Sequence, residues 1–209
     1  MPPRLHREIM ELLLGRIAAG TYPAGSMLPK EQQLAAELDV SRGVVRECIR
    51  ALEERGVVRV RHGRGATVLP ARAWDVLDPD VFAAVHGAPG GRRLVGEAAE
   101  ARAIVLGEAA ALAAGRGRPD ALRTLSAAVD TIETAPDELV GAAALEFERA
   151  LADASGNRLL ARVAAALAEA AGGIAALDGA QREVLDAIVA GDAARARDAI
   201  AGQLASARR

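Results

Sequence analysis

Apolar side chains recur every three or four positions between residues 5 and 19, which is the spacing of one face of a helix. They are Leu5, Ile9, Leu12, Leu13 and Ile17. Gly20 ends this predicted helix, and the segment TYPAGSMLP after it has the prolines and the glycine of an ordered turn. The segment KEQQLAAEL, residues 30–38, predicts a second, shorter helix. The chain therefore begins with two helices that a turn separates.

A third predicted helix follows the second after only the dipeptide DV. Ser41 is a good N-cap for this helix, and Gly56 ends it. Two helices joined by so short a connection indicate a helix-turn-helix. In the next segment, VVRVRHGRGATVLP, valines alternate with arginines, and Gly63 and Gly65 mark a turn. This alternation predicts a two-stranded hairpin, or wing, directly after the third helix.

Proline and glycine are frequent between residues 70 and 93, which indicates a linker that carries one short helix. Beyond it, helical spacing predicts helices at about residues 94–115, 118–134, 137–154, 157–176, 180–190 and 192–207. The predicted fold is therefore mainly α. Residues 1–70 form a winged helix-turn-helix of three helices plus a two-stranded wing, residues 71–93 form the linker, and residues 94–209 form an all-α helical bundle.

Charge separates the two ends of the chain, although the formal net charge is only −2. Residues 1–70 hold 11 Lys and Arg against 8 Asp and Glu, whereas residues 71–209 hold 15 against 20. A basic N-terminal domain can bind a polyanion, and the acidic remainder would be repelled by it.

Composition narrows the class of protein further. Aromatic residues make up only 2% of the chain and alanine is abundant in the C-terminal part, which predicts helices that approach closely through small side chains. The single cysteine, Cys48, excludes an internal disulfide and a cysteine-rich zinc site. No uncharged apolar run reaches about 18 residues and the first residues lack a signal-peptide core, so we expect a soluble protein of the cytoplasm.

The third predicted helix has an apolar face and a basic face. The apolar face consists of Val45, Cys48, Ile49 and Leu52. Arg42, Arg46 and Arg50 lie four residues apart on another face. A helix of about 10 to 12 Å diameter fits the major groove of B-DNA, where arginine can bind guanine or a phosphate. We expect Arg42 and Arg46 at base edges or nearby phosphates, and Arg50 farther along the DNA backbone.

Further DNA contacts are expected on both sides of this helix. Ser41 offers a hydroxyl and backbone N–H groups to a phosphate. In the wing, Gly63 lets the turn approach the duplex closely, with His62 and Arg64 beside it. The alternative is that the basic residues only solvate an exposed helix. Residues 55–65 favour DNA, because they hold four arginines and a histidine and no acid.

One long motif covers the predicted helix-turn-helix: GTYPAGSMLPKEQQLA, followed by VSRGVVRE. With the wing after it, this motif resembles the winged helix-turn-helix of the GntR family of bacterial transcription regulators over residues 5–69. The resemblance implies a DNA contact at Gln32, where many relatives carry arginine, and Lys30 stands where a serine cap is common. We therefore expect one half-site contact to be weaker or differently directed.

The C-terminal part resembles the all-helical FCD effector domain of the FadR subfamily. Three segments carry this resemblance: AEARAIVLGEAAALAA (99–114), ALEFERALADASGN (144–157) and QREVLDAIVAGDAARARDAIAGQL (181–204). The short segment AWDVLDPDV is also similar to regulators of sugar-acid catabolism of the galactonate type.

Many FCD domains hold a divalent metal through one Asp and three His, and the resemblance places these positions at Ala144, Glu148, Gln181 and Gln203. None keeps its ligand type, so we expect no metal and no cofactor. We expect these positions to form a polar pocket instead, in which Gln181 and Gln203 hydrogen-bond an organic effector and Arg102 binds its carboxylate or phosphate. The alternative is that the polar side chains bind only one another or water.

The sequence thus predicts a ligand-responsive regulator, in this family most often a repressor, with a small organic or sugar acid as effector. It would bind an inverted repeat in double-stranded operator DNA as a homodimer, because one recognition helix reads only a few base pairs. Two alternatives are a ligand-independent DNA-binding protein with a degenerate pocket, and an enzyme. Against an enzyme, His6, His62 and His86 all lie outside the bundle, and we expect no catalytic residues and no membrane partner.

Overall fold

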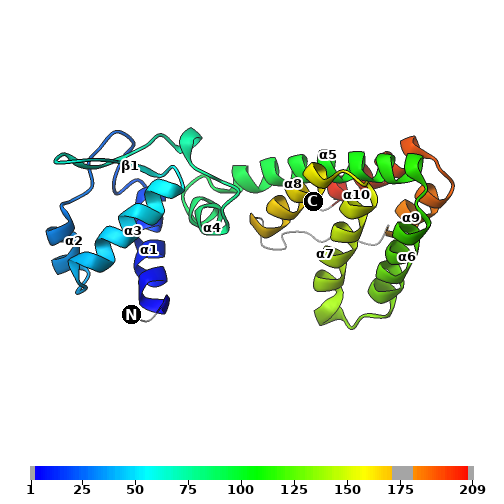
Figure 1. Ribbon diagram of the computed structural model, residues 1–209, viewed down its shortest axis with the longest axis horizontal. Coiled ribbons are helices and arrows are strands. Elements are labelled where there is room, and N and C mark those ends of the chain that lie inside the picture. The colour runs from blue at the N-terminus through cyan, green and yellow to red at the C-terminus, as the bar shows by residue number, and fades with distance from the viewer. Residues whose placement is uncertain (1–2, 171–180, 207–209) are drawn as a thin grey trace. The chain divides into compact units, whose positions relative to one another are not determined.

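The computed structural model describes residues 3–170 and 181–206, with side chains for 5–170 and 181–202. It divides into two compact units, Met1–Leu94 and Val95–Arg209 (Figure 1). Each unit has its own hydrophobic core. The mainly helical fold that the sequence predicts is confirmed.

The N-terminal unit is a helix-turn-helix followed by a wing. Its first elements are α1 (Pro3–Ala18), α2 (Glu31–Glu37) and α3 (Arg42–Glu54), and both α1 and α2 pack on α3. Leu13, Leu34 and Leu52 are fully buried where these helices meet. Burying one leucine side chain contributes roughly 2 kcal/mol, so these contacts stabilise the packing of the three helices.

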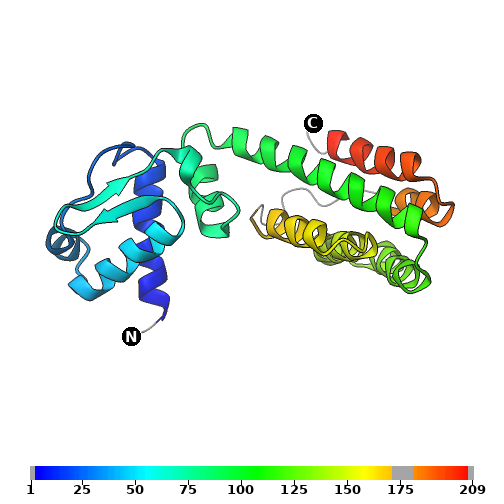
Figure 2. The same cartoon turned by 45° about the horizontal axis from the view of Figure 1, so that its top comes forward.

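The wing is an antiparallel pair of strands, β1 (Val58–Arg61) and β2 (Gly65–Val68), drawn as two arrows in Figure 2. The register pairs Val58 with Val68 and Val60 with Ala66. Val58, Ala66 and Val68 are buried, but Val60 is 41% exposed, so only the base of the hairpin packs on the core. The alternation of valine and arginine thus marks the strands correctly and overstates how much of β1 is buried.

Helix α4 (Pro79–Gly87) is the short helix expected in the linker, and it packs on α1 of the N-terminal unit. Asp78 caps it by accepting hydrogen bonds from the backbone N–H groups of Asp80 (3.0 Å) and Val81 (3.1 Å). Val81 is fully buried in the same core as α1 and α3. The segment predicted as a linker therefore contributes to the core of the N-terminal unit, which extends to Leu94.

The C-terminal unit is all-helical. Its helices are α5 (Arg92–Arg116), α6 (Pro119–Thr134), α7 (Asp137–Ala154), α8 (Arg158–Ala170), α9 (Gln181–Val189) and α10 (Ala193–Ser206). Figure 1 shows α6 and α7 as neighbouring helices, and they pack together, as do α7 with α8 and α9 with α10. The end of the predicted helix 157–176, beyond residue 170, lies outside the described residues.

Small side chains let these helices approach closely, as the alanine content predicts. Phe147, Leu151 and Ile188 form the centre of the core, and alanines fill the space around them, among them Ala110, Ala113, Ala154, Ala187 and Ala196. Alanine also has the highest helix propensity, so the same residues favour the helices and their packing. Among the described residues, every helix is too short or too polar to cross a lipid bilayer.

Candidate DNA-binding surface and bundle pocket

The first turns of α3 present two arginines to solvent. Arg42 and Arg46 are exposed, and neither has a hydrogen-bond or ion-pair partner among the residues that the structure describes. The opposite face of α3 is buried, as predicted, through Val44, Val45, Cys48, Ile49 and Leu52. The helix therefore offers two unengaged guanidinium groups on a rigid support.

Ser41 begins α3 as the sequence predicts. Its hydroxyl oxygen accepts a hydrogen bond from the Val44 backbone N–H at 3.4 Å, and the side chain is exposed. The remaining N–H groups of the first turn point along the helix axis and are available to an anion such as a phosphate.

Arg50, one turn after Arg46, is held by a weak ion pair. Its Nη1 atom lies 3.5 Å from Glu47 Oε1, and both side chains are at least half exposed. Exposed pairs of this kind contribute about 0.5 kcal/mol, so a DNA phosphate could replace Glu47 as the partner of Arg50.

The start of α2 differs from the serine cap of many relatives. Lys30 occupies the cap position, and Gln33 caps from within the helix, because its Oε1 accepts the Lys30 backbone N–H at 3.0 Å. Gln32 is exposed on the same turn, where the sequence predicted a DNA contact.

The tip of the wing carries His62, Gly63 and Arg64, and all three are exposed. Gly63 has φ = 73°, in the left-handed region that favours glycine, and the Arg64 N–H donates to the Arg61 carbonyl at 2.9 Å to close the turn. A groove of about 270 Å³ lies under the wing, lined by Met27, Leu28, Pro29, Lys30, Glu31, Ile49, Val60, Gly63, Arg64, Gly65 and Ala66.

Arg55 shows that not every arginine of the basic stretch faces solvent. Its Nε atom lies 3.0 Å from Asp78 Oδ2 and its Nη2 atom lies 3.4 Å from Asp80 Oδ2, and the side chain is 23% exposed. Residues 55–65 hold no acid, but the start of α4 supplies two. Arg55 therefore connects the end of the recognition helix to α4, and it does not belong to the DNA-facing set.

In the C-terminal unit, Arg102 on α5 and Glu148 on α7 form a buried ion pair. The Arg102 Nε donates to Glu148 Oε2 at 2.8 Å, and its Nη2 donates to the other carboxylate oxygen. The two side chains are 3% and 4% exposed. Burial raises the pKa of the Glu148 carboxyl, and Arg102 opposes that rise. The structure thus brings together two of the predicted effector residues, and they bind each other.

The remaining family metal positions do not complete a metal site. Ala144, one turn before Glu148, is fully buried and has no ligand group, and Gln181 on α9 offers a neutral amide. The side chain of Gln203 lies outside the described residues. Across the described ranges, no group of three or more His, Cys, Asp or Glu side chains is placed to hold a metal ion. At the described positions 144, 148 and 181, the side chains do not provide the histidine ligands that such an ion prefers.

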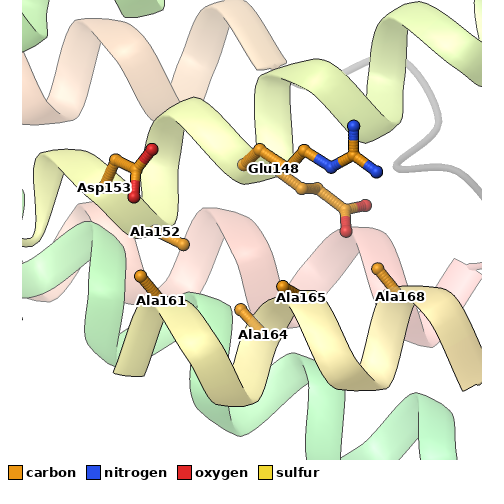
Figure 3. Close-up of a pocket in the computed structure, with 8 residues that line it drawn as sticks. Glu148, Ala152, Asp153, Ala161, Ala164, Ala165 and Ala168 are labelled. Carbon is orange, nitrogen blue, oxygen red and sulfur yellow. The ribbon is translucent and has the colours of Figure 1, made fainter. Parts of the chain in front are cut away.

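A pocket of about 210 Å³ lies between α7 and α8. It is lined by Glu148, Arg149, Ala152, Asp153, Ala161, Ala164, Ala165 and Ala168. In Figure 3, Glu148 and Asp153 lie on α7, and the alanines from 161 to 168 lie on α8. Arg102 and Gln181 are not among the lining residues, so Glu148 links the buried ion pair to the pocket.

Comparison with known families settles which family has this arrangement. The model for bacterial regulatory proteins of the gntR family matches residues 5–68, and the model for the FCD domain matches residues 97–206. The chain belongs to the GntR family. Its N-terminal unit is the family's DNA-binding domain, and its C-terminal unit is an FCD domain.

Relatives in this family are named as transcriptional regulators. The HTH-type regulator Rv0494 of Mycobacterium tuberculosis is 32% identical over 158 residues, which cover 75% of this chain and 64% of that protein. The galactonate operon transcriptional repressor of Escherichia coli is 33% identical over 120 residues, which cover 57% and 52%. The chain thus matches between about half and two thirds of the length of these relatives.

Two solved structures share the fold. The GntR protein of Streptococcus agalactiae is 29% identical with a TM-score of 0.55, and the match covers 98% of this chain and 99% of that one. Lar of Listeria monocytogenes has a TM-score of 0.63 at 22% identity, with coverage of 97% and 94%, and supports the fold alone.

Proposed function

We propose that this GntR protein is a ligand-responsive transcriptional repressor that binds an inverted repeat as a homodimer. The observation that carries the proposal is the pair Arg42 and Arg46, exposed on the first turns of α3 and without a partner among the described residues. Placed in the major groove, these guanidinium groups can donate two hydrogen bonds to guanine or bind phosphates. Ser41 at the start of α3, Arg50 one turn after Arg46 and the exposed Gln32 on α2 would bind the DNA backbone around them.

The homodimer follows from the small number of bases that one α3 can reach. Two copies related by a two-fold axis double the contacts and make an inverted repeat the matching target. A relative named as the galactonate operon repressor supports repression over activation. The effector would change the spacing of the two DNA-binding domains, with a coupling of about 1 to 3 kcal/mol.

The effector is proposed to be a small organic or sugar acid that binds in the FCD domain. The galactonate regulator's name supports a sugar acid. The pocket of about 210 Å³ is smaller than the usual range for ligand sites, so it would hold only a small acid unless it opens on binding. To reach Arg102, an acid would displace the Glu148 carboxylate and make the same forked hydrogen bonds. Glu148, whose pKa burial already raises, would then take up a proton.

The DNA-binding proposal can be tested with one substitution and one control. Arg46→Ala should abolish the gel shift of a duplex selected by the wild-type protein from a random pool. Arg72→Ala is the control, because Arg72 is also an exposed arginine of the N-terminal unit and lies outside α3 and the wing. If Arg46→Ala binds the duplex as tightly as wild type, the proposal that α3 contacts the DNA bases through Arg46 is wrong.

A ligand-independent DNA-binding protein is the second candidate, and one observation favours it. Arg102 and Glu148 already satisfy each other in a buried pair, so the FCD domain has a stable arrangement without an effector. A thermal-shift screen of aldonic and hydroxy acids separates the candidates, because a ligand that binds the folded state raises its melting temperature. If no acid stabilises the wild-type protein while DNA binding persists, the second candidate is the better one.

A further inference from the structure

The outer edge of β1 is bound by a single acidic side chain. The Val60 backbone N–H points away from β2 and donates to Oε1 of Glu53 at 2.8 Å. Glu53 lies in the last turn of α3, seven residues earlier in the chain. This hydrogen bond joins the recognition helix directly to the wing.

The opposite edge of the wing is held by the backbone. Along β2, the Leu28 N–H donates to the Ala66 carbonyl, and the Gly25 N–H donates to the Val68 carbonyl, each at 2.9 Å. The segment of residues 25–28 therefore holds one side of the hairpin through main-chain bonds that no side-chain substitution removes.

Side chains pack the base of the wing on the core of the N-terminal unit, but they leave a groove under the wing tip. The groove of about 270 Å³ lies there, with Ile49 of α3 and Val60 of β1 among its lining residues. Met27 and Val60 remain 57% and 41% exposed at this groove. Because the strands span a groove at this point, the angle of the wing tip depends on its hydrogen bonds more than on buried apolar contacts.

The charge of Glu53 is unfavourable in two respects. A carboxylate in the last turn of a helix opposes the helix dipole, and one near a DNA-binding surface repels phosphates. Glu54, the next residue, carries the same two costs and has no partner among the described side chains. Only Glu53 combines these costs with a hydrogen bond to the wing.

We propose that Glu53 is a positioning residue that fixes the wing relative to the recognition helix. With the wing held in place, His62 and Arg64 reach the DNA while Arg42 and Arg46 lie in its major groove. This inference depends on the proposed DNA binding and adds a residue that itself makes no DNA contact.

Three single substitutions separate the hydrogen bond from the charge. Glu53→Gln keeps an acceptor oxygen and removes the charge, Glu53→Ala removes both, and Glu54→Ala removes a charge alone. On the duplex selected by the wild-type protein, we expect Glu53→Gln and Glu54→Ala to bind as tightly as wild type or about twofold more tightly. We expect Glu53→Ala to bind about fivefold more weakly than Glu53→Gln, because the wing loses its support.

A fourth substitution, Arg64→Ala, tests whether the weaker binding of Glu53→Ala acts through the wing. Arg64→Ala should weaken binding in the wild-type background and should cost much less in the Glu53→Ala background, since a displaced wing no longer places Arg64 at a phosphate. The slope of log affinity against log salt should also be shallower for Glu53→Ala than for Glu53→Gln. Melting temperatures of the two Glu53 variants report folding separately.

The outcomes are distinct. If wild-type protein binds no duplex, the proposed function fails, and the role of Glu53 fails with it. If wild type binds and Glu53→Ala behaves like Glu54→Ala, the positioning role alone is wrong. It is also wrong if Arg64→Ala costs the same in both backgrounds.

Discussion

At the scale of single residues, the buried pair of Arg102 and Glu148 is the unusual feature of the FCD domain. Charges this deeply buried persist only when each satisfies the other, and the forked geometry of the guanidinium allows two parallel hydrogen bonds. The sequence predicted each residue as part of a polar pocket. It did not predict their contact, because the two residues lie 46 positions apart and local spacing carries no information about partners at that distance.

Removing one partner of this ion pair should lower the stability of the C-terminal unit. Glu148→Ala removes the carboxylate that makes two hydrogen bonds to the buried Arg102 guanidinium, and we expect a loss of about 3 to 5 kcal/mol in the free energy of unfolding of the C-terminal unit. The double variant Arg102→Met, Glu148→Leu removes both charges and should recover most of that loss. Denaturant titration followed by circular dichroism measures both. A double variant as unstable as Glu148→Ala would contradict the account.

Glu148 stands at one of the family's metal-ligand positions, where it binds Arg102. With alanine at position 144 and Glu148 bound to Arg102, a chelator should change neither DNA affinity nor melting temperature. Thermal-shift measurements with EDTA, and with added zinc or nickel, check this. Stabilisation by either metal at micromolar concentration would mean that the other donors form a site.

At the scale of elements, glycine and proline allowed most of the helices to be predicted, because they interrupt the apolar spacing where these helices end, and the N-cap Ser41 marked the boundary between α2 and α3. The packing of α4 was not predictable in the same way. Val81 and Phe82 are too few apolar residues to indicate a core partner, and the acids that bind Arg55 lie 23 and 25 residues after it. A linker and a docked helix therefore look alike in the sequence.

The ion pairs between α9 and α6 should make the stability of the C-terminal unit depend on pH. Arg182 on α9 donates to Glu133 and Asp130 on α6, and its hydrogen bond lowers the pKa of the Glu133 carboxyl. A carboxyl with a lowered folded-state pKa stabilises the fold above its ordinary pKa, and this contribution is lost as pH falls through the folded-state value.

Arg182→Gln should therefore lower the melting temperature slightly at pH 7, by about 2 °C at most because these side chains are exposed. The difference from wild type should become smaller at about pH 3, because the Glu133 carboxylate loses its charge as pH falls through its lowered folded-state pKa. Differential scanning calorimetry at the two pH values tests this. A deficit that is equal at both values would exclude the ion pairs as its cause.

At the scale of the whole molecule, one chain combines a GntR DNA-binding domain with an FCD domain. Basic residues are in excess in the N-terminal part, and acidic residues are in excess in the remainder. The sequence predicted the helix-turn-helix and the basic face of its third helix, because that motif is local and continuous, and the structure shows Arg42 and Arg46 exposed on α3. The sequence could not predict which arginines bind acids elsewhere, as Arg55 does. In the proposed binding mode, two copies of α3 read adjacent major grooves through Arg42 and Arg46.

Dimethyl sulfate protection of a bound duplex tests this binding mode most directly, because the reagent methylates guanine N7 in the major groove, where arginine binds. We predict that the wild-type protein protects guanines in two half-sites about one helical turn apart. The double variant Arg42→Ala, Arg46→Ala should protect none at a concentration where nonspecific binding persists. Unchanged protection by the double variant would contradict the account.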